Sequence, residues 1–288
     1  MSMRIAQFFD LFKLRIGLVI GFTAVAGLAV TRGPSSPVRG MLVTLAVVVA
    51  SAAAGAFNQY VERDIDARMA RTRRRPFVTG ALARSRGWLL LIGAMVVGAG
   101  ALAAIAANAL AALYTLAGAF VYGVVYTVWL KRRTWLNIVV GGLAGSCAVL
   151  AGAAAIAPGR LDPAPLALAV VLFLWTPPHF WSLGIACRED YQAAGIPMLP
   201  ALVGDAKCAR AVLAGTTLLV AASLVPAWYG LSWIYLAAAV AGGAWFLYTS
   251  IALVRTPGRA TAMVNFHASL AQLTLLLAGA IADATLLG

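Results

Sequence analysis

The sequence has little charge and little cysteine. Only 11% of its 288 residues are charged, against roughly 25% in an ordinary soluble domain. Such a chain cannot cover a soluble surface with charge, so the composition excludes an ordinary soluble enzyme. The three cysteines, Cys147, Cys187 and Cys208, lack the paired spacing of a zinc or redox site. We interpret them as free thiols.

Several catalytic motifs are also missing. The chain contains no GxxxxGK[ST] phosphate loop, no GxSxG serine turn and no CxxCH haem-attachment site. The net charge of +13 is typical of nucleic-acid-binding proteins, but these cations lie at the ends of apolar segments. We therefore expect no nucleic-acid partner and interpret the cations as determinants of membrane orientation.

Long apolar runs make up most of the chain. Apolar residues account for 62% of it, with a mean hydropathy of +0.91. Because a helix needs about 20 such residues to cross a bilayer, the pattern predicts an all-α polytopic membrane protein. The nine expected transmembrane helices cover residues 16–31, 41–57, 88–107, 110–130, 135–157, 164–186, 211–229, 231–254 and 263–282.

The distribution of cations predicts the orientation. Successive connections between membrane spans lie on alternate sides of the membrane, so the N-terminus shares one side with the loops 58–87, 131–133, 188–210 and 255–259. That side holds 19 of the 22 Lys and Arg residues. The side rich in cations is cytoplasmic by the positive-inside rule. The sequence therefore predicts an inner (cytoplasmic) membrane protein with a cytoplasmic N-terminus and with Gly288 on the opposite side.

The same topology predicts the domain organisation. Residues 1–288 form one membrane-embedded domain. The two long acidic loops, after the second and sixth spans, open on the same face four helices apart. This spacing suggests duplicated four-helix halves, 16–133 and 134–254, followed by a ninth helix over 263–282.

The strongest local signal is a cluster of carboxylates after the second span. Asn58, Glu62 and Asp66 recur every four residues, so on a continuous helix their side chains stack on one face. Oxygen ligands of this kind suit Mg²⁺, which usually binds one or two carboxylates together with substrate phosphates. The Arg-rich stretch 68–76 can clamp those phosphates. The alternative is a juxtamembrane helix end whose carboxylates simply pair with neighbouring arginines.

A second polar segment lies near the end of the sixth span. His179 follows the pair Pro177–Pro178, and Asp190 comes eleven residues later, about 20° away around a continuous helix. We therefore expect both side chains to face one cavity, because ionisable residues inside membranes are candidates for function. The alternative is a structural, hydrogen-bonded histidine. We leave the roles of Asp64, Glu189 and His267 open.

These residues resemble a known family, the intramembrane aromatic prenyltransferases. The first signature of that superfamily is Asn-x-x-x-Asp-x-x-x-Asp, and Asn58, Glu62 and Asp66 match it with Glu in place of the first Asp. Further blocks, over residues 63–76, 126–134, 177–183 and 190–200, are similar to the haem-modifying branch, the protohaem IX farnesyltransferases. Together the matches span residues 58–200.

The resemblance implies an activity and its partners. It implies a bundle of about nine spans around a lipid-open cavity that faces the cytoplasm, in which farnesyl diphosphate and Mg²⁺ bind. The farnesyl group is transferred to a vinyl group of haem B (protohaem IX), giving haem O for haem-copper oxidases. Membrane lipid surrounds the enzyme, and a haem A synthase or an oxidase assembly protein is an expected partner.

The resemblance also implies roles for individual residues, which divide into three groups. Asn58, Glu62, Asp66 and Asp190 are the expected metal ligands. Arg71, Arg75, Lys131 and Arg132 are expected to hold the diphosphate, and His179 and Trp181 are expected to contact haem.

Two other functions fit part of the pattern. A quinone- or chlorophyll-type prenyltransferase shares the fold and the first step but uses another acceptor. A transporter is the alternative from a different class, but it predicts charges within the spans, whereas here nearly all charges lie at the ends of the spans.

Overall fold

The computed structural model describes residues 5–34, 36–160 and 162–287, and the regular structure in these ranges is entirely helical. The first part contains α1 (Ile5–Leu11), α2 (Leu14–Ala29), α3 (Pro37–Val61), α4 (Arg63–Arg68), α5 (Pro76–Thr79), α6 (Arg86–Ala106), α7 (Ala109–Phe120) and the π-helix η1 (Val121–Leu130). The second contains α8 (Asn137–Gly141), α9 (Leu143–Ile156), α10 (Pro163–Ala186), α11 (Arg188–Ala193), α12 (Leu199–Val203), α13 (Asp205–Ala222), the 3₁₀-helix η2 (Val225–Tyr229), α14 (Trp233–Arg255) and α15 (Arg259–Leu286).

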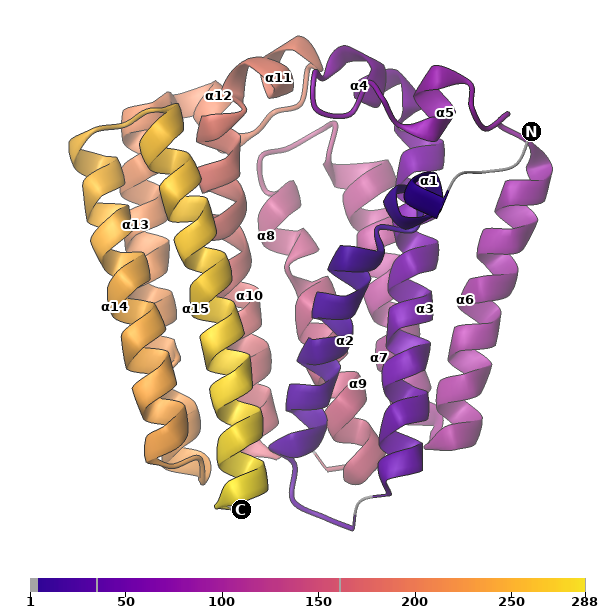
Figure 1. The fold of residues 1–288 in the computed structure, drawn as a ribbon, viewed down its shortest axis with the longest axis vertical. Coiled ribbons are helices and arrows are strands. Elements are labelled where there is room, and N and C mark those ends of the chain that lie inside the picture. Colours follow the sequence, from indigo (N-terminus) through magenta and orange to yellow (C-terminus); the bar gives the residue numbers. More distant parts are fainter. Residues whose placement is uncertain (1–4, 35, 161, 288) are drawn as a thin grey trace.

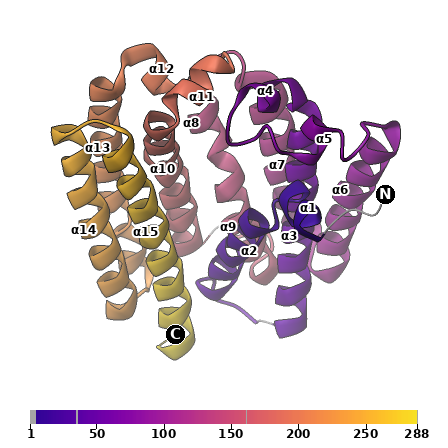
Figure 2. The same ribbon diagram turned by 45° about the horizontal axis from the view of Figure 1, so that its top comes forward.

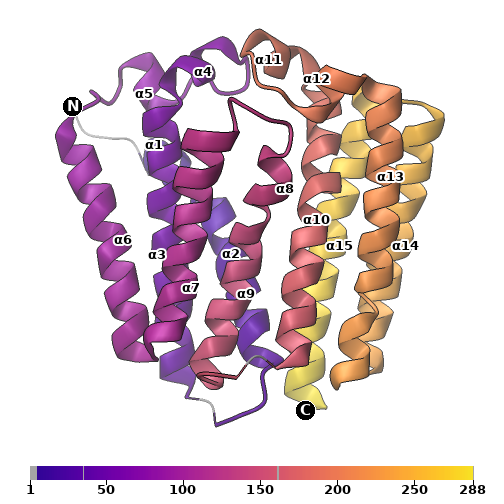
Figure 3. The ribbon, with the colours of Figure 1, turned by 180° about the vertical axis from the view of Figure 1, so that it is seen from behind.

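The long helices stand side by side in a bundle (Figures 1 and 3). The short helices α4, α5, α11 and α12 cover one end, drawn at the top of Figure 1, and Figure 2 turns this end towards the viewer. The connection from η1 to α8 and that from α14 to α15 lie at the same end. This confirms that the four long or basic loops share one end of the bundle. Gly288 lies outside the described residues.

Eight stretches of the described chain are long and apolar enough to cross a membrane: 37–61, 86–106, 109–130, 137–156, 163–186, 205–229, 233–255 and 259–286. They agree with eight of the nine expected spans. The remaining expected span, 16–31, corresponds to α2, which has only 16 residues and is shorter than the about 20 that a bilayer requires. The bundle nevertheless includes α2, which lies between α3 and α15 in Figure 1.

Local sequence signals fix several helix ends. Ser36 caps α3 and is followed by Pro37 in the first turn, where the missing N–H of proline costs nothing. The Asn108 side chain accepts a hydrogen bond from the N–H of Ala111 at 2.9 Å and caps α7. The carboxylate of Asp283, on α15, accepts from the backbone N–H groups of Ser232 and Tyr235 and so caps α14 from a distant part of the chain.

Small residues let α2 approach α9 closely. A Cβ atom added at Gly27 would collide with the carbonyl oxygen of Val149, and one added at Gly152 with that of Ala24. Backbone contact of this kind is typical of membrane helix pairs, in which packing replaces the hydrophobic effect. Gly27 and Gly152 therefore serve the close packing of α2 against α9.

The π-helix η1 changes which residues share a face at the end of the fourth span. In an α-helix, the nine residues from Tyr122 to Lys131 turn through about 900°, which puts the two on opposite sides. In a π-helix, with hydrogen bonds to the fifth residue along, nine residues make roughly two full turns. The bond from the Lys131 N–H to the Tyr126 carbonyl, at 2.9 Å, has this five-residue spacing. Lys131 therefore points to the same side as Tyr122.

Candidate active site

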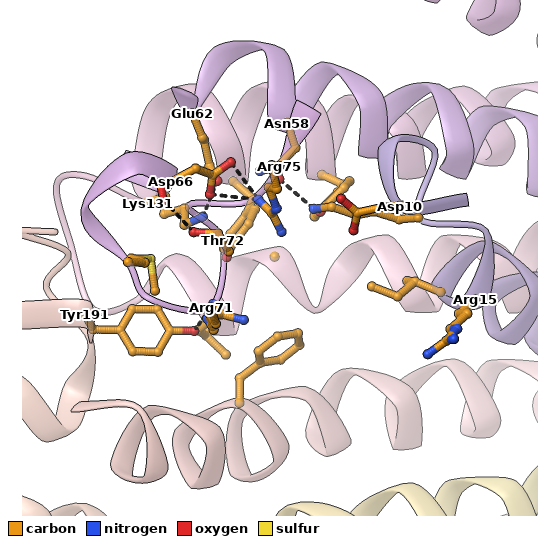
Figure 4. A pocket seen from close by; sticks show the side chains of 18 of the residues that line it. Asp10, Arg15, Asn58, Glu62, Asp66, Arg71, Thr72, Arg75, Lys131 and Tyr191 are labelled. Atoms are coloured by element: carbon orange, nitrogen blue, oxygen red, sulfur yellow. Dashed lines mark hydrogen bonds and ion pairs between the residues drawn. The ribbon is translucent and has the colours of Figure 1, made fainter. Parts of the chain in front are cut away.

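A cavity of about 690 Å³ opens at the end of the bundle that carries the short helices. Its lining comes from both parts of the chain: Phe9, Asp10, Lys13, Arg15, Ile16, Asn58, Glu62, Asp66, Met69, Arg71, Thr72, Arg75, Tyr122, Tyr126, Lys131, Ile138, Gly141, Thr176, Phe180 and Tyr191. Figure 4 shows Asn58, Glu62 and Asp66 together on one side, near Lys131 and Arg75.

The three residues of the sequence motif do converge, but the helix that carries them is broken. The expectation of one continuous helix through Asp66 is wrong, because α3 ends at Val61 and Glu62 adopts φ −90° and ψ 16° before α4 begins. The N–H of Glu62 still bonds the carbonyl of Asn58, and that of Asp66 bonds Glu62, at 2.9 and 2.8 Å. The four-residue spacing therefore survives the break, and all three side chains reach the cavity.

Each motif residue is paired with a cation from a different segment. Lys13 Nζ donates to Asn58 Oδ1 at 2.6 Å, and Lys131 Nζ donates to Glu62 Oε2. Arg75 Nη1 donates to both carboxylate oxygens of Asp66, at 2.8 Å each. The two carboxylates, Glu62 and Asp66, are thus each paired with a cation, and the third cation, Lys13, bonds the neutral amide of Asn58.

The donor set fits a hard cation such as Mg²⁺. Glu62 is fully buried, and its Oε1 atom has no hydrogen-bond partner among the described residues, which leaves an oxygen ready for another ligand. No three His, Cys, Asp or Glu side chains of the described chain gather into an all-protein metal site. The oxygen atoms of Asn58, Glu62 and Asp66 are of the type that Mg²⁺ binds, because this ion takes a few protein oxygens and completes its shell with waters and substrate phosphates.

A second cationic group lies across the cavity from Asp10 and Arg15 (Figure 4). Arg71 Nη2 donates to the hydroxyl of Tyr191 at 3.0 Å, and its guanidinium carbon lies 5.3 Å from the centre of that ring. Tyr191 belongs to α11, so this contact joins the loop after α4 to the second part of the chain. Arg71 therefore lines the cavity, as the phosphate role expected for it requires.

Asp190 lies close to the site but outside the cavity lining. Its Oδ1 accepts from the backbone N–H of Ala70 at 3.1 Å. Since α10 ends at Ala186 and a separate helix begins at Arg188, the expected continuous helix from His179 to Asp190 does not exist. The prediction that both face one cavity is wrong for this reason.

His179 belongs to α10, packs against α15 and is also outside the cavity lining. Its ring stacks on Trp175 at 4.1 Å and on Phe266 at 4.5 Å, and its Nδ1 lies 2.7 Å from Ser269 Oγ. The helix α10 runs through Pro177 and Pro178 without ending. The proline pair therefore does not break the helix before His179.

Trp181 and Arg132 also lie outside the cavity lining. The Trp181 ring packs in an apolar cluster with Ile185 and Leu199, and its Nε1 has no partner among the described residues. Arg132 forms an exposed two-bond ion pair with Asp64, at 2.8 Å for each bond. Hydrogen bonding from Arg132 is the main reason why the pKa of the Asp64 carboxyl is lowered. The haem and phosphate roles expected for Trp181 and Arg132 stay predictions.

Sequence reasoning missed Lys13 and Tyr122. Lys13, at the junction of α1 and α2, has φ 47°, a left-handed conformation that turns the chain into the cavity. Its Nζ also donates to the Tyr122 hydroxyl at 2.9 Å. The pKa of Lys13 is lowered to about 7, mainly because its side chain is buried and secondly because the positive charge of Arg75 is nearby. Its position before an apolar run made it look like a simple topology signal.

Comparison with known proteins places the chain in a family. It matches the UbiA prenyltransferase family over residues 19–276. A relative in Paramagnetospirillum magneticum, named protoheme IX farnesyltransferase 2, is 57% identical over 282 residues, covering 97% of this chain and 97% of the relative. A second protein of that organism, named protoheme IX farnesyltransferase 1, is 47% identical and covers 98% of this chain and 99% of the relative.

Solved structures share the fold. The structure of a digeranylgeranylglyceryl phosphate synthase matches with a TM-score of 0.79 at 16% identity, covering 97% of this chain and 98% of that one. A UbiA homolog from Archaeoglobus fulgidus bound to GPP and Mg²⁺ gives 0.70 at 16% identity, covering 97% and 100%. The predicted all-helical membrane fold and the resemblance to intramembrane prenyltransferases are confirmed. The chain belongs to the UbiA prenyltransferase family.

Proposed function

We propose that this protein transfers the farnesyl group of farnesyl diphosphate to a vinyl group of haem B, which gives haem O. The observation that carries the proposal is the identity of 57% over nearly the whole chain to a relative named protoheme IX farnesyltransferase. The cavity supports it, because cations and buried carboxylates meet there as an ionising diphosphate requires.

In this proposal the diphosphate, which is the leaving group of the reaction, binds to the cations of the cavity. Lys13, Arg75 and Lys131 are hydrogen-bonded to the motif, and Arg71 lines the same cavity beside Tyr191. Each is placed to bond phosphate oxygens as negative charge accumulates on the departing diphosphate. Because the cluster is held by buried hydrogen bonds, these charges are oriented before the substrate arrives.

Asn58, Glu62 and Asp66 would hold Mg²⁺ in this site, with the free Glu62 Oε1 as the most available oxygen. When bound, the ion neutralises charge on the diphosphate and so favours its departure. A solved UbiA homolog contains Mg²⁺ together with GPP. We extend that association to this chain, with Asp190 as a further expected ligand.

His179 is the residue we assign to haem. The Ser269 hydroxyl donates to the carbonyl of Phe266 at 2.6 Å, so the His179 Nδ1–H donates to Ser269 Oγ. The Nε2 atom then keeps its lone pair, which is the form that ligates iron or removes a proton from water. The flat rings of Trp175 and Phe266 hold the imidazole in one orientation.

The proposed function has a direct test. Purified protein is incubated with haem B, farnesyl diphosphate and Mg²⁺, and the extracted haem is analysed by mass spectrometry. A gain of one farnesyl group plus one water is expected. If a prenyl acceptor such as a quinone precursor is modified while haem is not, the acceptor assignment is wrong and the prenyltransferase assignment stands.

His179→Ala should weaken haem binding more than it changes farnesyl diphosphate binding. The loss of a ligand or hydrogen bond to haem is expected to raise the dissociation constant about tenfold, equivalent to about 1.4 kcal/mol. Absorbance titration measures haem binding, and calorimetry with a non-cleavable diphosphate analogue measures the other substrate. His267→Ala, at an exposed position on α15, is the matched control. Unchanged haem affinity in His179→Ala would return His179 to a structural role.

We propose that the cavity faces the cytoplasm of an inner-membrane protein. The end of the bundle with the cavity carries the loops that hold most of the cations, which supports this orientation. Cysteines introduced at Arg73 and Lys207, after replacement of the native cysteines, should both react with an impermeant reagent only from the cytoplasmic side. Labelling of the two positions from opposite sides would contradict the topology.

A further inference from the structure

A second, smaller cavity lies at the end of the bundle opposite the candidate active site. It is a groove of about 240 Å³ between the first half of α10 and the segment that joins α13 to α14. Figure 3 shows the start of α10 at the lower end of the bundle, far from α11 and α12. The described residues that line the groove include Pro163, Leu166, Ala167, Val170, Val225 and Tyr229.

One face of α10 forms a wall of the groove. Pro163, Leu166, Ala167 and Val170 follow one another at spacings of three, one and three residues, so they lie on one side of the helix. The seven residues from Pro163 to Val170 rise about 10 Å along the helix axis. The groove therefore starts at the end of α10 and runs towards the middle of the bundle, as an extended hydrocarbon chain in a bilayer does.

Aromatic side chains mark the start of the groove as a membrane interface. Trp228 and Trp233 are 80% and 69% exposed, and they flank the turn that contains Tyr229 and Gly230. Trp and Tyr gather where the bilayer meets water, at the depth of the lipid headgroups. The groove thus begins at headgroup depth, and its other end lies at the depth of the acyl chains.

A cation without a partner lies beside this turn. The guanidinium of Arg32, from the connection between α2 and α3, packs on Gly230, because a Cβ atom added there would lie 2.7 Å from Arg32 Nη2. Within the described part of the chain, Arg32 forms no ion pair and no side-chain hydrogen bond. An arginine placed in this way can donate two hydrogen bonds to a phosphate group.

The carboxylates at this end of the bundle are already engaged. Asp283 accepts hydrogen bonds from the backbone N–H and the hydroxyl of Ser232, and Asp162 is paired with Arg160. Arg32 therefore lacks a counter-charge from the chain. A phosphate at the start of the groove would supply that charge.

We propose that this groove binds one acyl chain of an anionic phospholipid whose phosphate contacts Arg32. Arg32 belongs to the first part of the chain and the groove belongs to the second, so the lipid bridges the two parts at the end opposite the active site. The bound lipid stabilises the fold and takes no part in the reaction. It is therefore expected whichever acceptor the enzyme uses.

The combination of groove and cation makes the site selective. Both contact the same molecule, so a lipid that fills both binds more tightly than either of its parts alone. Inorganic phosphate has no chain for the groove. A zwitterionic phospholipid carries an ammonium group, which the positive charge of Arg32 repels. The site therefore favours a phospholipid of net negative charge.

The test compares lipids on delipidated protein in detergent. Phosphatidylglycerol, phosphatidylcholine with the same acyl chains, and inorganic phosphate are titrated separately while the unfolding temperature is measured. Native mass spectrometry counts the lipids that stay bound. We expect phosphatidylglycerol to raise the unfolding temperature by about 5 °C, phosphatidylcholine to have a much smaller effect, and phosphate to have none. In Arg32→Gln, the phosphatidylglycerol concentration that gives half of the shift should rise about tenfold.

Ala167→Phe tests the groove separately from the cation, because the larger side chain fills the groove and should prevent lipid retention. Its matched control is Ala221→Phe, at an exposed position on α13 outside the groove lining. Arg39→Gln, at an exposed position in the first turn of α3, is the control for Arg32→Gln. Both controls should retain lipid as the parent does. Turnover of farnesyl diphosphate should stay within about twofold in all four variants, because the active site is distant, and this shows that they are folded.

Several outcomes would contradict the proposed lipid site. Equal stabilisation by phosphatidylcholine, or stabilisation by phosphate alone, would overturn it, as would full lipid retention in either Arg32→Gln or Ala167→Phe. If the parent protein is a dimer that Ala167→Phe dissociates, and no lipid is retained, the groove is an interface between copies of the chain and the lipid assignment is wrong.

Discussion

Asp66→Asn is expected to lower turnover at least about 100-fold while the protein stays folded. The carboxylate of Asp66 accepts both hydrogen bonds from Arg75 Nη1, so an amide removes the charge and replaces one acceptor by a donor. The predicted metal loses a ligand and Arg75 loses its position beside the diphosphate. Removing one preorganised group of this kind typically costs about 10²–10³ in kcat.

Asp64→Asn is the matched control for Asp66→Asn. Asp64 lies two residues earlier in the same short helix, but its side chain is exposed and pairs with Arg132 outside the cavity. We expect its turnover to stay within about twofold of the parent, since exposed ion pairs contribute little. Steady-state rates over a Mg²⁺ titration, with size-exclusion profiles in detergent, separate the two variants. Near-normal activity of Asp66→Asn would reduce Asp66 to a structural ion-pair partner.

Lys131→Gln is expected to damage both stability and activity. The substitution leaves the buried Glu62 carboxylate without its counter-charge, which costs about 3–5 kcal/mol for a buried pair. It also removes a cation from the diphosphate site, so turnover should fall at least about 100-fold. Thermal unfolding in detergent and turnover of farnesyl diphosphate measure the two effects.

The double variant Glu62→Gln with Lys131→Gln separates these effects. Two neutral side chains no longer leave a buried charge unpaired, so most of the lost thermal stability should return. Activity should not return, because the metal ligand and the phosphate cation are both gone. Arg133→Gln, at an exposed neighbouring position, is the control for changes at this helix end. Recovery of activity in the double variant would contradict the assigned roles.

The sequence was sufficient to predict the parts of the site that are local in the chain. The four-residue recurrence of Asn58, Glu62 and Asp66 predicted their convergence, and the cation distribution predicted which loops share one end. The break at Glu62 was not predictable from this spacing, because the residue carries no proline or glycine signal and the backbone bonds continue through it.

The features missed from the sequence depend on distant contacts. Lys13 reaches the cavity only because of its left-handed backbone and its bond to Asn58, 45 residues away. The π-winding that turns Lys131 towards the site has no composition signature. His179 was expected beside Asp190 from helical spacing alone, and the helix end at Ala186, together with the partners of His179 on α15, overrode that spacing.

The pairing of each motif residue with its own cation has a consequence for biosynthesis. The cations Lys13, Arg75 and Lys131, like Asn58, Glu62 and Asp66, all come from the first 131 residues, and they enter the membrane before α10 is synthesised. Charge neutralisation of the motif is thus complete when the first four apolar segments have been inserted. The later helices, which bring Phe180 and Tyr191 to the cavity wall, can then pack against the first half of the chain, in which the most costly polar groups are already paired.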